Sequence, residues 1–115
     1  MLCAMRDRSS TLSGLLAAAS TGAIRYGGAT ISCPDLAARA ARIAGGLTRL
    51  GIGSGDRVAL WLPNTPAWLE MLFALGRIGA VAVAVNTRFR AVEVADIVGR
   101  SRCRALVMWP GFKGI

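Results

Sequence analysis

The chain has 115 residues, of which 54% are hydrophobic and 17% are charged; this composition excludes an intrinsically disordered protein and suits one small domain with a buried core. The formal net charge of +8 would suit a nucleic-acid-binding protein. However, the arginines are scattered, and their one cluster, Arg100, Arg102 and Arg104, has no aromatic residue interleaved for base stacking. We therefore expect no nucleic-acid partner and retain a basic nucleic-acid-binding domain only as the least favoured alternative.

Histidine and cysteine usage limits the chemistry further. The sequence has no histidine, which removes Ser-His-Asp catalysis, Cys-His catalysis and most zinc sites. Its three cysteines, at positions 3, 33 and 103, have neither metal-ligand nor disulfide spacing, as is typical of a reducing compartment. We expect no metal site, no catalytic residue of these classes and a cytoplasmic location.

The amino-terminal residues predict a disordered start and a short helix. Residues 1–10 contain three charged side chains and are expected to be the disordered start. Residues 11–19, TLSGLLAAA, are barely long enough for the apolar core of a signal peptide, and Ser13 and Gly14 interrupt the run. We therefore expect a short amphipathic helix packed on the domain.

A β-hairpin and a long helix come next. Residues 23–32 contain two short strand-like runs around a Gly-Gly pair, which is a strong turn signal. Ser32 and Asp35 have the spacing of a capping box, and Pro34 falls in the first helical turn. Apolar residues then recur at helical spacing: Leu36, Ala40, Ile43, Ala44, Leu47 and Leu50. We expect an amphipathic helix that Gly51 ends.

Residues 51–56, GIGSGD, contain three glycines at alternate positions and superficially resemble a dinucleotide-binding fingerprint. A phosphate-binding glycine loop follows a strand and begins a helix, whereas this segment follows a helix and begins a strand. We expect an ordinary turn.

The centre of the chain predicts a strand–helix–strand unit. Residues 57–62 and 81–85 are short apolar runs that suit strands buried on both faces. Between them, Thr65 is expected to cap a helix with its hydroxyl, Pro66 to occupy the first turn, and Gly79 to end the helix in the left-handed conformation. Two parallel strands joined through a helix form a right-handed βαβ unit.

The same region is the most apolar part of the chain and has to be weighed as a membrane span. Residues 67–85 are interrupted by Glu70, Arg77 and two glycines, and their period changes from helical to strand-like. A span of about 20 uniformly apolar residues would show neither feature. We expect no membrane span.

Residues 86–90 leave the carboxyl end of a parallel strand, where open α/β sheets place their ligands. Arg88 lies in this segment. Spacing alone favours a solvated loop arginine, with a ligand-binding role as the alternative.

The last elements are a helix over residues 92–98 and a strand over residues 105–109. Glu93 and Asp96 share a helix face at three-residue spacing. A carboxylate pair could act as acid and base, but we expect an exposed helix face.

Three segments carry a resemblance to a known family. They are SCPDL (residues 32–36), GDRVALWLPN (residues 55–64) and LGRIGAVAVAVNTR (residues 75–88), followed by the last helix and strand. In this order they resemble the amino-terminal part of the AMP-forming acyl-CoA synthetases of the adenylate-forming superfamily, over about residues 12–109. Cys33 replaces the usual aromatic residue and Ala84 the usual proline.

The resemblance implies an α/β fold with a partial three-layer architecture, a mostly parallel sheet of Rossmann-like βαβ units and a small N-terminal hairpin. Residues 11–115 would be the amino-terminal portion of an AMP-binding domain, incomplete because the family's phosphate loop, ribose-binding acidic residue, hinge and late catalytic lysine would follow Ile115. The alternative is a free-standing Rossmann-like binding module.

The implied activity of the whole family member, in fatty acid or related metabolism, joins a carboxylic acid to coenzyme A with ATP and Mg²⁺. In some members an arginine matching Arg88 lies near the phosphates of coenzyme A. This chain alone is expected to be inactive and to bind neither ATP nor coenzyme A tightly. The acyl substrate, fatty or aromatic, stays open, and self-association through an exposed sheet edge at residues 105–109 is expected.

Overall fold

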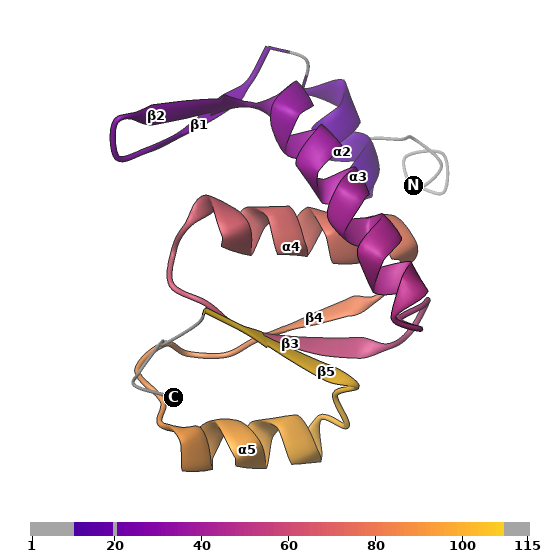
Figure 1. Cartoon of the computed structure of the whole chain (residues 1–115), viewed down its shortest axis with the longest axis vertical. Helices are drawn as coiled ribbons and strands as arrows, with labels where there is room; N and C mark the ends of the chain where they lie inside the picture. The colour runs from indigo at the N-terminus through magenta and orange to yellow at the C-terminus, as the bar shows by residue number, and fades with distance from the viewer. Residues whose placement is uncertain (1–10, 20, 110–115) are drawn as a thin grey trace, which may run out of the picture.

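The computed structural model describes residues 11–19 and 21–109 (Figure 1). The disordered start expected at residues 1–10 lies outside the described residues. In chain order the elements are α2 (Leu12–Ala18), β1 (Ala23–Tyr26), β2 (Ala29–Ser32), α3 (Cys33–Arg49), β3 (Arg57–Trp61), α4 (Pro66–Ile78), β4 (Val81–Ala84), α5 (Ala91–Arg100) and β5 (Ala105–Met108).

The central feature is a three-stranded parallel sheet with the order β4-β3-β5. Arg57 pairs with Val81 on one side of β3, and Val58 pairs with Ala105 on the other. Helices α3 and α4 lie on one side of the sheet, with α2 packed against both, and α5 lies on the opposite side (Figure 1). The predicted three-layer α/β fold with βαβ units is confirmed.

The sequence of strand β3 is almost entirely apolar because both faces of the strand are buried. Val58 and Leu60 belong to the hydrophobic cluster under α3 and α4, whereas Ala59 and Trp61 belong to the cluster under α5. Alternate side chains of a strand point to opposite faces, and all four residues are at most 1% exposed. The prediction of a strand buried on both faces is confirmed.

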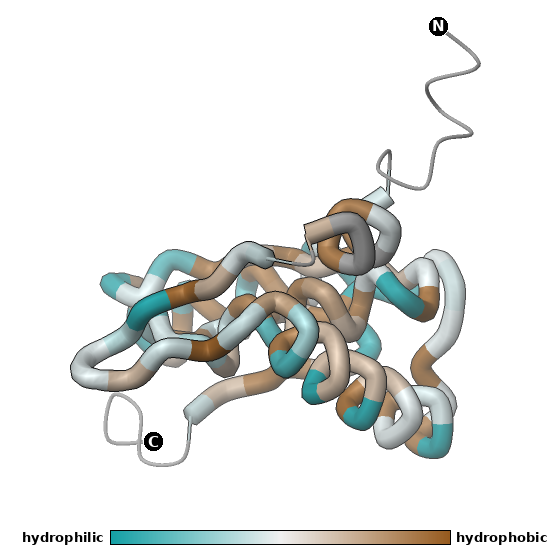
Figure 2. Tube along the Cα trace, turned by 90° about the horizontal axis from the view of Figure 1, so that it is seen from above, coloured by the Kyte–Doolittle hydropathy of each residue, from teal (hydrophilic) through white to brown (hydrophobic). Residues whose placement is uncertain are grey.

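The hairpin and α3 form as the sequence predicts. Strands β1 and β2 pair antiparallel, with Gly27 at a φ of +59° in the turn. The Ser32 hydroxyl accepts a hydrogen bond from the backbone N–H of Asp35 at 3.2 Å and so caps α3. The hairpin projects beyond the helical layer (Figure 1), and both hydrophilic and hydrophobic residues occur along the helical turns (Figure 2).

The start of α4 differs from the prediction in one detail. Thr65 occupies the N-cap position but makes no capping hydrogen bond. Its hydroxyl instead donates to the carbonyl oxygen of Pro63 at 3.4 Å, so the expected hydroxyl cap is wrong. The end of the helix is as predicted, because Gly79 has a φ of +76°.

Helix α5 begins one residue earlier and ends two residues later than residues 92–98, and β5 ends at Met108 rather than at 109. Within the part of the chain that the structure describes, no helix combines the length and the apolar character that crossing a membrane requires.

Candidate functional site

The loop that follows β4 has a defined conformation. The side-chain Oδ1 of Asn86 accepts a hydrogen bond from the backbone N–H of Arg88 at 2.9 Å. The backbone N–H of Phe89 donates to the carbonyl oxygen of Asn86 at 3.1 Å. These bonds fold the loop back on itself as Asx turns do, so the backbone beneath Arg88 is held in place.

Arg88 itself is exposed at the carboxyl end of the sheet. Its guanidinium makes no ion pair or hydrogen bond with any residue that the structure describes. Other arginines are engaged: Arg39 pairs with Glu70 and Arg104 with Asp56. Arg88 therefore offers an available positive charge on a fixed loop.

A cavity of about 430 Å³ lies beside this loop, between the carboxyl ends of β3 and β4. Its lining contains no carboxylate, so it does not oppose the approach of an anion. Polar side chains come from Asn64, Asn86 and Thr87, and apolar ones include Leu62, Trp68 and Val85. Arg88 follows Thr87 in the chain but is not part of the lining.

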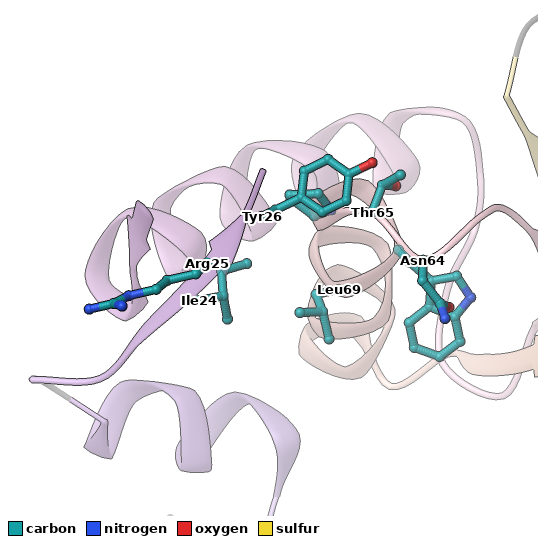
Figure 3. Close-up of a pocket in the computed structure, with 8 residues that line it drawn as sticks. Ile24, Arg25, Tyr26, Asn64, Thr65 and Leu69 are labelled. Atoms are coloured by element: carbon teal, nitrogen blue, oxygen red, sulfur yellow. The ribbon is translucent and has the colours of Figure 1, made fainter. Parts of the chain in front are cut away.

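A second cavity, of about 290 Å³, lies between β1 and the start of α4 (Figure 3). Ile24 and Tyr26 come from the hairpin, and Leu69 comes from the first turns of α4. In the close-up, Arg25 extends away from Asn64 and Leu69. Both cavities include Asn64 and Trp68 in their linings, so the two hollows adjoin at these residues.

Sequence reasoning missed both cavities and the residues that they share. Asn64 follows the predicted strand by two positions, at the sheet edge where ligands are expected. This position is the sequence signal that could have identified Asn64 as a candidate site residue. Nothing in the spacing predicts that the hairpin packs near α4, because this contact joins segments about 40 residues apart.

The other candidates from the sequence have structural roles. Glu93 accepts a hydrogen bond from the backbone N–H of Arg90 at 2.9 Å, and Asp96 pairs with Arg100 at 3.1 Å. Each carboxylate is thus engaged locally at the surface of α5. The expected turn at residues 51–56 is present, and Asp56 accepts the N–H of Gly53 at 2.8 Å.

No group of three His, Cys, Asp or Glu side chains placed to hold a metal ion occurs among residues 11–19 and 21–109. Within those ranges Cys33 and Cys103 are free thiols. Burial raises the pKa of the Cys103 thiol, and the nearby positive charge of Arg57 acts in the opposite direction.

Comparison with known proteins identifies the family. Residues 17–113 match the model of the AMP-binding enzymes. The chain is 42% identical over 88 residues to a feruloyl-CoA synthase of an Amycolatopsis species, covering 76% of this chain and 18% of that protein. It is 36% identical over 72 residues to the mitochondrial medium-chain acyl-CoA ligase of Homo sapiens, covering 63% of this chain and 12% of that protein.

A solved structure has the same fold. The fatty acyl CoA synthetase of Mycobacterium tuberculosis superposes with a TM-score of 0.77 at 31% identity, and the match covers 89% of this chain and 22% of that protein. The chain thus spans about a fifth of the length of such relatives. The family match, together with the parallel sheet and hairpin that align with this synthetase, leads to one conclusion: the chain belongs to the AMP-binding enzyme family.

Proposed function

We propose that residues 11–115 form the amino-terminal portion of the domain of an AMP-forming acid–thiol ligase and act mainly as its scaffold. In the whole enzyme, a carboxylate attacks the α-phosphorus of Mg²⁺-bound ATP and releases pyrophosphate. The thiol of coenzyme A then attacks the acyl-adenylate, forms a thioester and releases AMP. Family membership supports this proposal, as do relatives named feruloyl-CoA synthase and medium-chain acyl-CoA ligase. Because the first name states an aromatic acyl group and the second an aliphatic one, the class of acyl substrate stays open.

We propose that Arg88 binds a phosphate of coenzyme A. The supporting observation is an unengaged guanidinium on a loop fixed by Asn86, at the carboxyl edge of a parallel sheet and beside a cavity without carboxylates. A guanidinium can donate two parallel hydrogen bonds to a phosphate. An anchor of this kind orients the thiol substrate without taking part in bond making or breaking.

The first prediction concerns the chain alone. Nothing among residues 11–19 and 21–109 provides a glycine-rich loop that follows a strand and begins a helix, the arrangement that holds transferring phosphates. We expect ATP–pyrophosphate exchange at background level with ferulate, benzoate and medium-chain fatty acids. Exchange above background with any of these acids would contradict the scaffold role.

A chimera tests the parent function. Residues 17–113 would replace the equivalent segment of the Amycolatopsis feruloyl-CoA synthase, with which the chain shares 42% identity. We expect the chimera to form both the adenylate and the thioester. A folded chimera that forms neither would reject the proposed scaffold function.

The second prediction uses the same chimera. Arg88→Ala should weaken apparent coenzyme A affinity by about ten- to a hundredfold, because charge-assisted hydrogen bonds to the phosphate are lost. Adenylate formation should be unchanged, since the guanidinium meets only the thiol substrate. The matched control is Arg77→Ala, which removes an exposed arginine in the last turn of α4, away from the loop that contains Arg88. Equal loss in both half-reactions would indicate a structural loop residue, and no loss would remove Arg88 from the site.

A further inference from the structure

We infer that the edge of the parallel sheet at which β3 and β5 begin binds the surface of an anionic lipid bilayer. One leucine enters the bilayer interface there, and the arginines around it contact lipid phosphates. The inference does not depend on the proposed ligase function. The surface is called the basic edge and consists of six exposed residues: Arg49, Leu50, Arg57, Arg100, Arg102 and Arg104.

The chain topology brings these residues together from three segments. Helices α3 and α5 end on the side of the sheet where β3 and β5 begin (Figure 1). The Nη1 of Arg57 donates a hydrogen bond to the carbonyl oxygen of Ser101 at 3.0 Å. A Cβ built on Gly51 would lie 3.7 Å from Nη2 of Arg104. The turn after α3, the start of β3 and the turn after α5 therefore form one continuous surface.

The basic edge carries more positive charge than the neighbouring acidic residues balance. Two of its arginines are paired, Arg104 with Asp56 at 3.6 Å and Arg100 with Asp96 at 3.1 Å. The other three have no acidic partner within the part of the chain that the structure describes: Arg49, Arg57 and Arg102. The acidic residues in the first turns of α3 and α5 lie at the far ends of these helices. An anionic surface thus meets three uncompensated guanidinium groups.

Leu50 is an apolar side chain held outward among these charges. It is 79% exposed and directly precedes Gly51, which has a φ of +90°. The backbone N–H of Ile52 donates to the carbonyl oxygen of Leu47 at 3.0 Å, as in the Schellman motif that ends many helices. Ile52 and Leu47 are buried, at 7% and 8% exposure. The motif therefore anchors both sides of the turn and leaves Leu50 in solvent on a fixed backbone.

An exposed leucine beside arginines fits a lipid bilayer better than a nucleic acid. Single-stranded nucleic acids stack on aromatic side chains, and the six residues of the basic edge include no aromatic one. At a bilayer, an apolar side chain enters the boundary of the acyl chains while basic side chains reach the headgroup phosphates. One leucine and three free charges provide weak, reversible attachment.

The test is cosedimentation of the 115-residue chain with vesicles of equal parts phosphatidylglycerol and phosphatidylcholine. We expect binding that decreases with added salt and is absent with phosphatidylcholine alone. One basic residue near such a surface contributes about fivefold to the partition coefficient, so Arg49→Gln combined with Arg102→Asn should weaken binding about 25-fold. Asparagine is chosen because it tolerates the φ of +52° at position 102. Leu50→Ser should weaken binding about tenfold.

Matched controls remove the same chemistry elsewhere on the chain. Arg25→Gln combined with Arg42→Gln removes two exposed arginines from the hairpin and the outer face of α3. Val92→Ser removes an 82% exposed apolar side chain from the first turn of α5. We expect both controls to weaken vesicle binding far less than the variants of the basic edge. Circular dichroism establishes that each variant is folded before its binding is compared.

Four results would overturn the inference. The first is a folded chain that does not bind the phosphatidylglycerol vesicles. The second is equal weakening by the two arginine pairs, which would indicate general attraction to a chain with a net charge of +8. The third is full binding by Leu50→Ser, which would reject insertion into a bilayer. The fourth is a single-stranded oligonucleotide that binds more tightly than the vesicles and is lost with the Arg49 and Arg102 pair, which would identify a nucleic-acid surface.

Discussion

The two faces of the parallel sheet are built to different degrees of completeness. Among the residues that the structure describes, ten buried ones form a single cluster under α3 and α4, including Val58, Leu60 and Leu75 at 0% exposure. In the same part of the chain, the buried cluster under α5 has four members. Beside it lies an apolar cavity of about 180 Å³ between α5 and β5. Nearby, Val92 is 82% exposed and Leu106 is 38% exposed.

The difference identifies the face under α5 as the less completely covered side of the sheet. Parallel sheets occur with both faces covered, and a single ten-residue helix does not cover three strands. Strand β5 pairs only with β3 among the described strands, so its outer edge presents backbone donors and acceptors. Because the chain spans about a fifth of its relatives' length, we expect the remaining residues of a whole ligase to cover this edge and face.

The largest effect should come from the packed face. Leu75→Ala removes a fully buried side chain from the cluster under α4, and we expect the free energy of unfolding to fall by about 2–5 kcal/mol. For a domain of this size such a loss would abolish most of the stability. Urea denaturation followed by circular dichroism measures the change.

Val94→Ala is the comparison on the other face. Val94 is also buried, at 2% exposure, but it lines the apolar cavity and so has fewer neighbours to lose. We expect a clearly smaller loss of stability than for Leu75→Ala. An equal or larger loss would show that the face under α5 is as tightly packed as the other.

The next largest effect should be a change in self-association when the β5 edge is altered. The exposed β5 edge and the apolar side chains next to it are the features that promote edge-to-edge pairing. We expect the chain to associate as its concentration rises, and Leu106→Lys to weaken association about tenfold, because a charge would have to be buried at the edge. Sedimentation velocity over a concentration series measures both.

The matched control for this edge is Val81→Lys. Val81 is 45% exposed on β4, the opposite edge of the sheet. If association uses β5 and the adjoining cavity, this variant should behave like the parent chain. A chain that stays monomeric at every concentration would instead show that the incomplete face is tolerated in water.

Local sequence signals predicted the elements of this fold well, for identifiable reasons. The Gly-Gly turn, the Ser32 cap and Gly79 each determine backbone geometry within a few residues. The Thr65 cap failed because a nearby carbonyl, that of Pro63, competes for the same hydroxyl. Such competition depends on the bend of the chain after β3, which composition does not encode.

The candidate site was predictable only in part. The position of Arg88 followed from the rule that ligands lie at the carboxyl ends of parallel strands. The neighbouring hollow did not, because it is shaped by Trp68 from α4 and Asn86 from the loop after β4. Long-range packing brings these side chains together, and one sequence carries no record of that contact.

The smallest effect concerns Cys103, which packs at the margin of the cluster under α5 and therefore reports on how closed that face is. Burial raises the pKa of its thiol, while the charge of Arg57 lowers it. In a variant with Cys3→Ser and Cys33→Ser, we expect alkylation of Cys103 by iodoacetamide to reach half its maximal rate at a higher pH in the folded chain than in urea. Arg57→Gln should move this midpoint higher still, whereas Arg57→Lys should not.

The direction of the linked stability follows from the same shift. Since the folded state holds the thiol proton more tightly, the contribution of Cys103 is complete below the pKa of the unfolded thiol. It is lost as the pH rises through the folded value. The unfolding free energy of this variant should therefore fall slightly with pH in that alkaline window, and replacing Cys103 with serine should remove the slope. A folded midpoint below the unfolded one would mean that the charge of Arg57 outweighs burial, and that the face under α5 is open to water even at its margin.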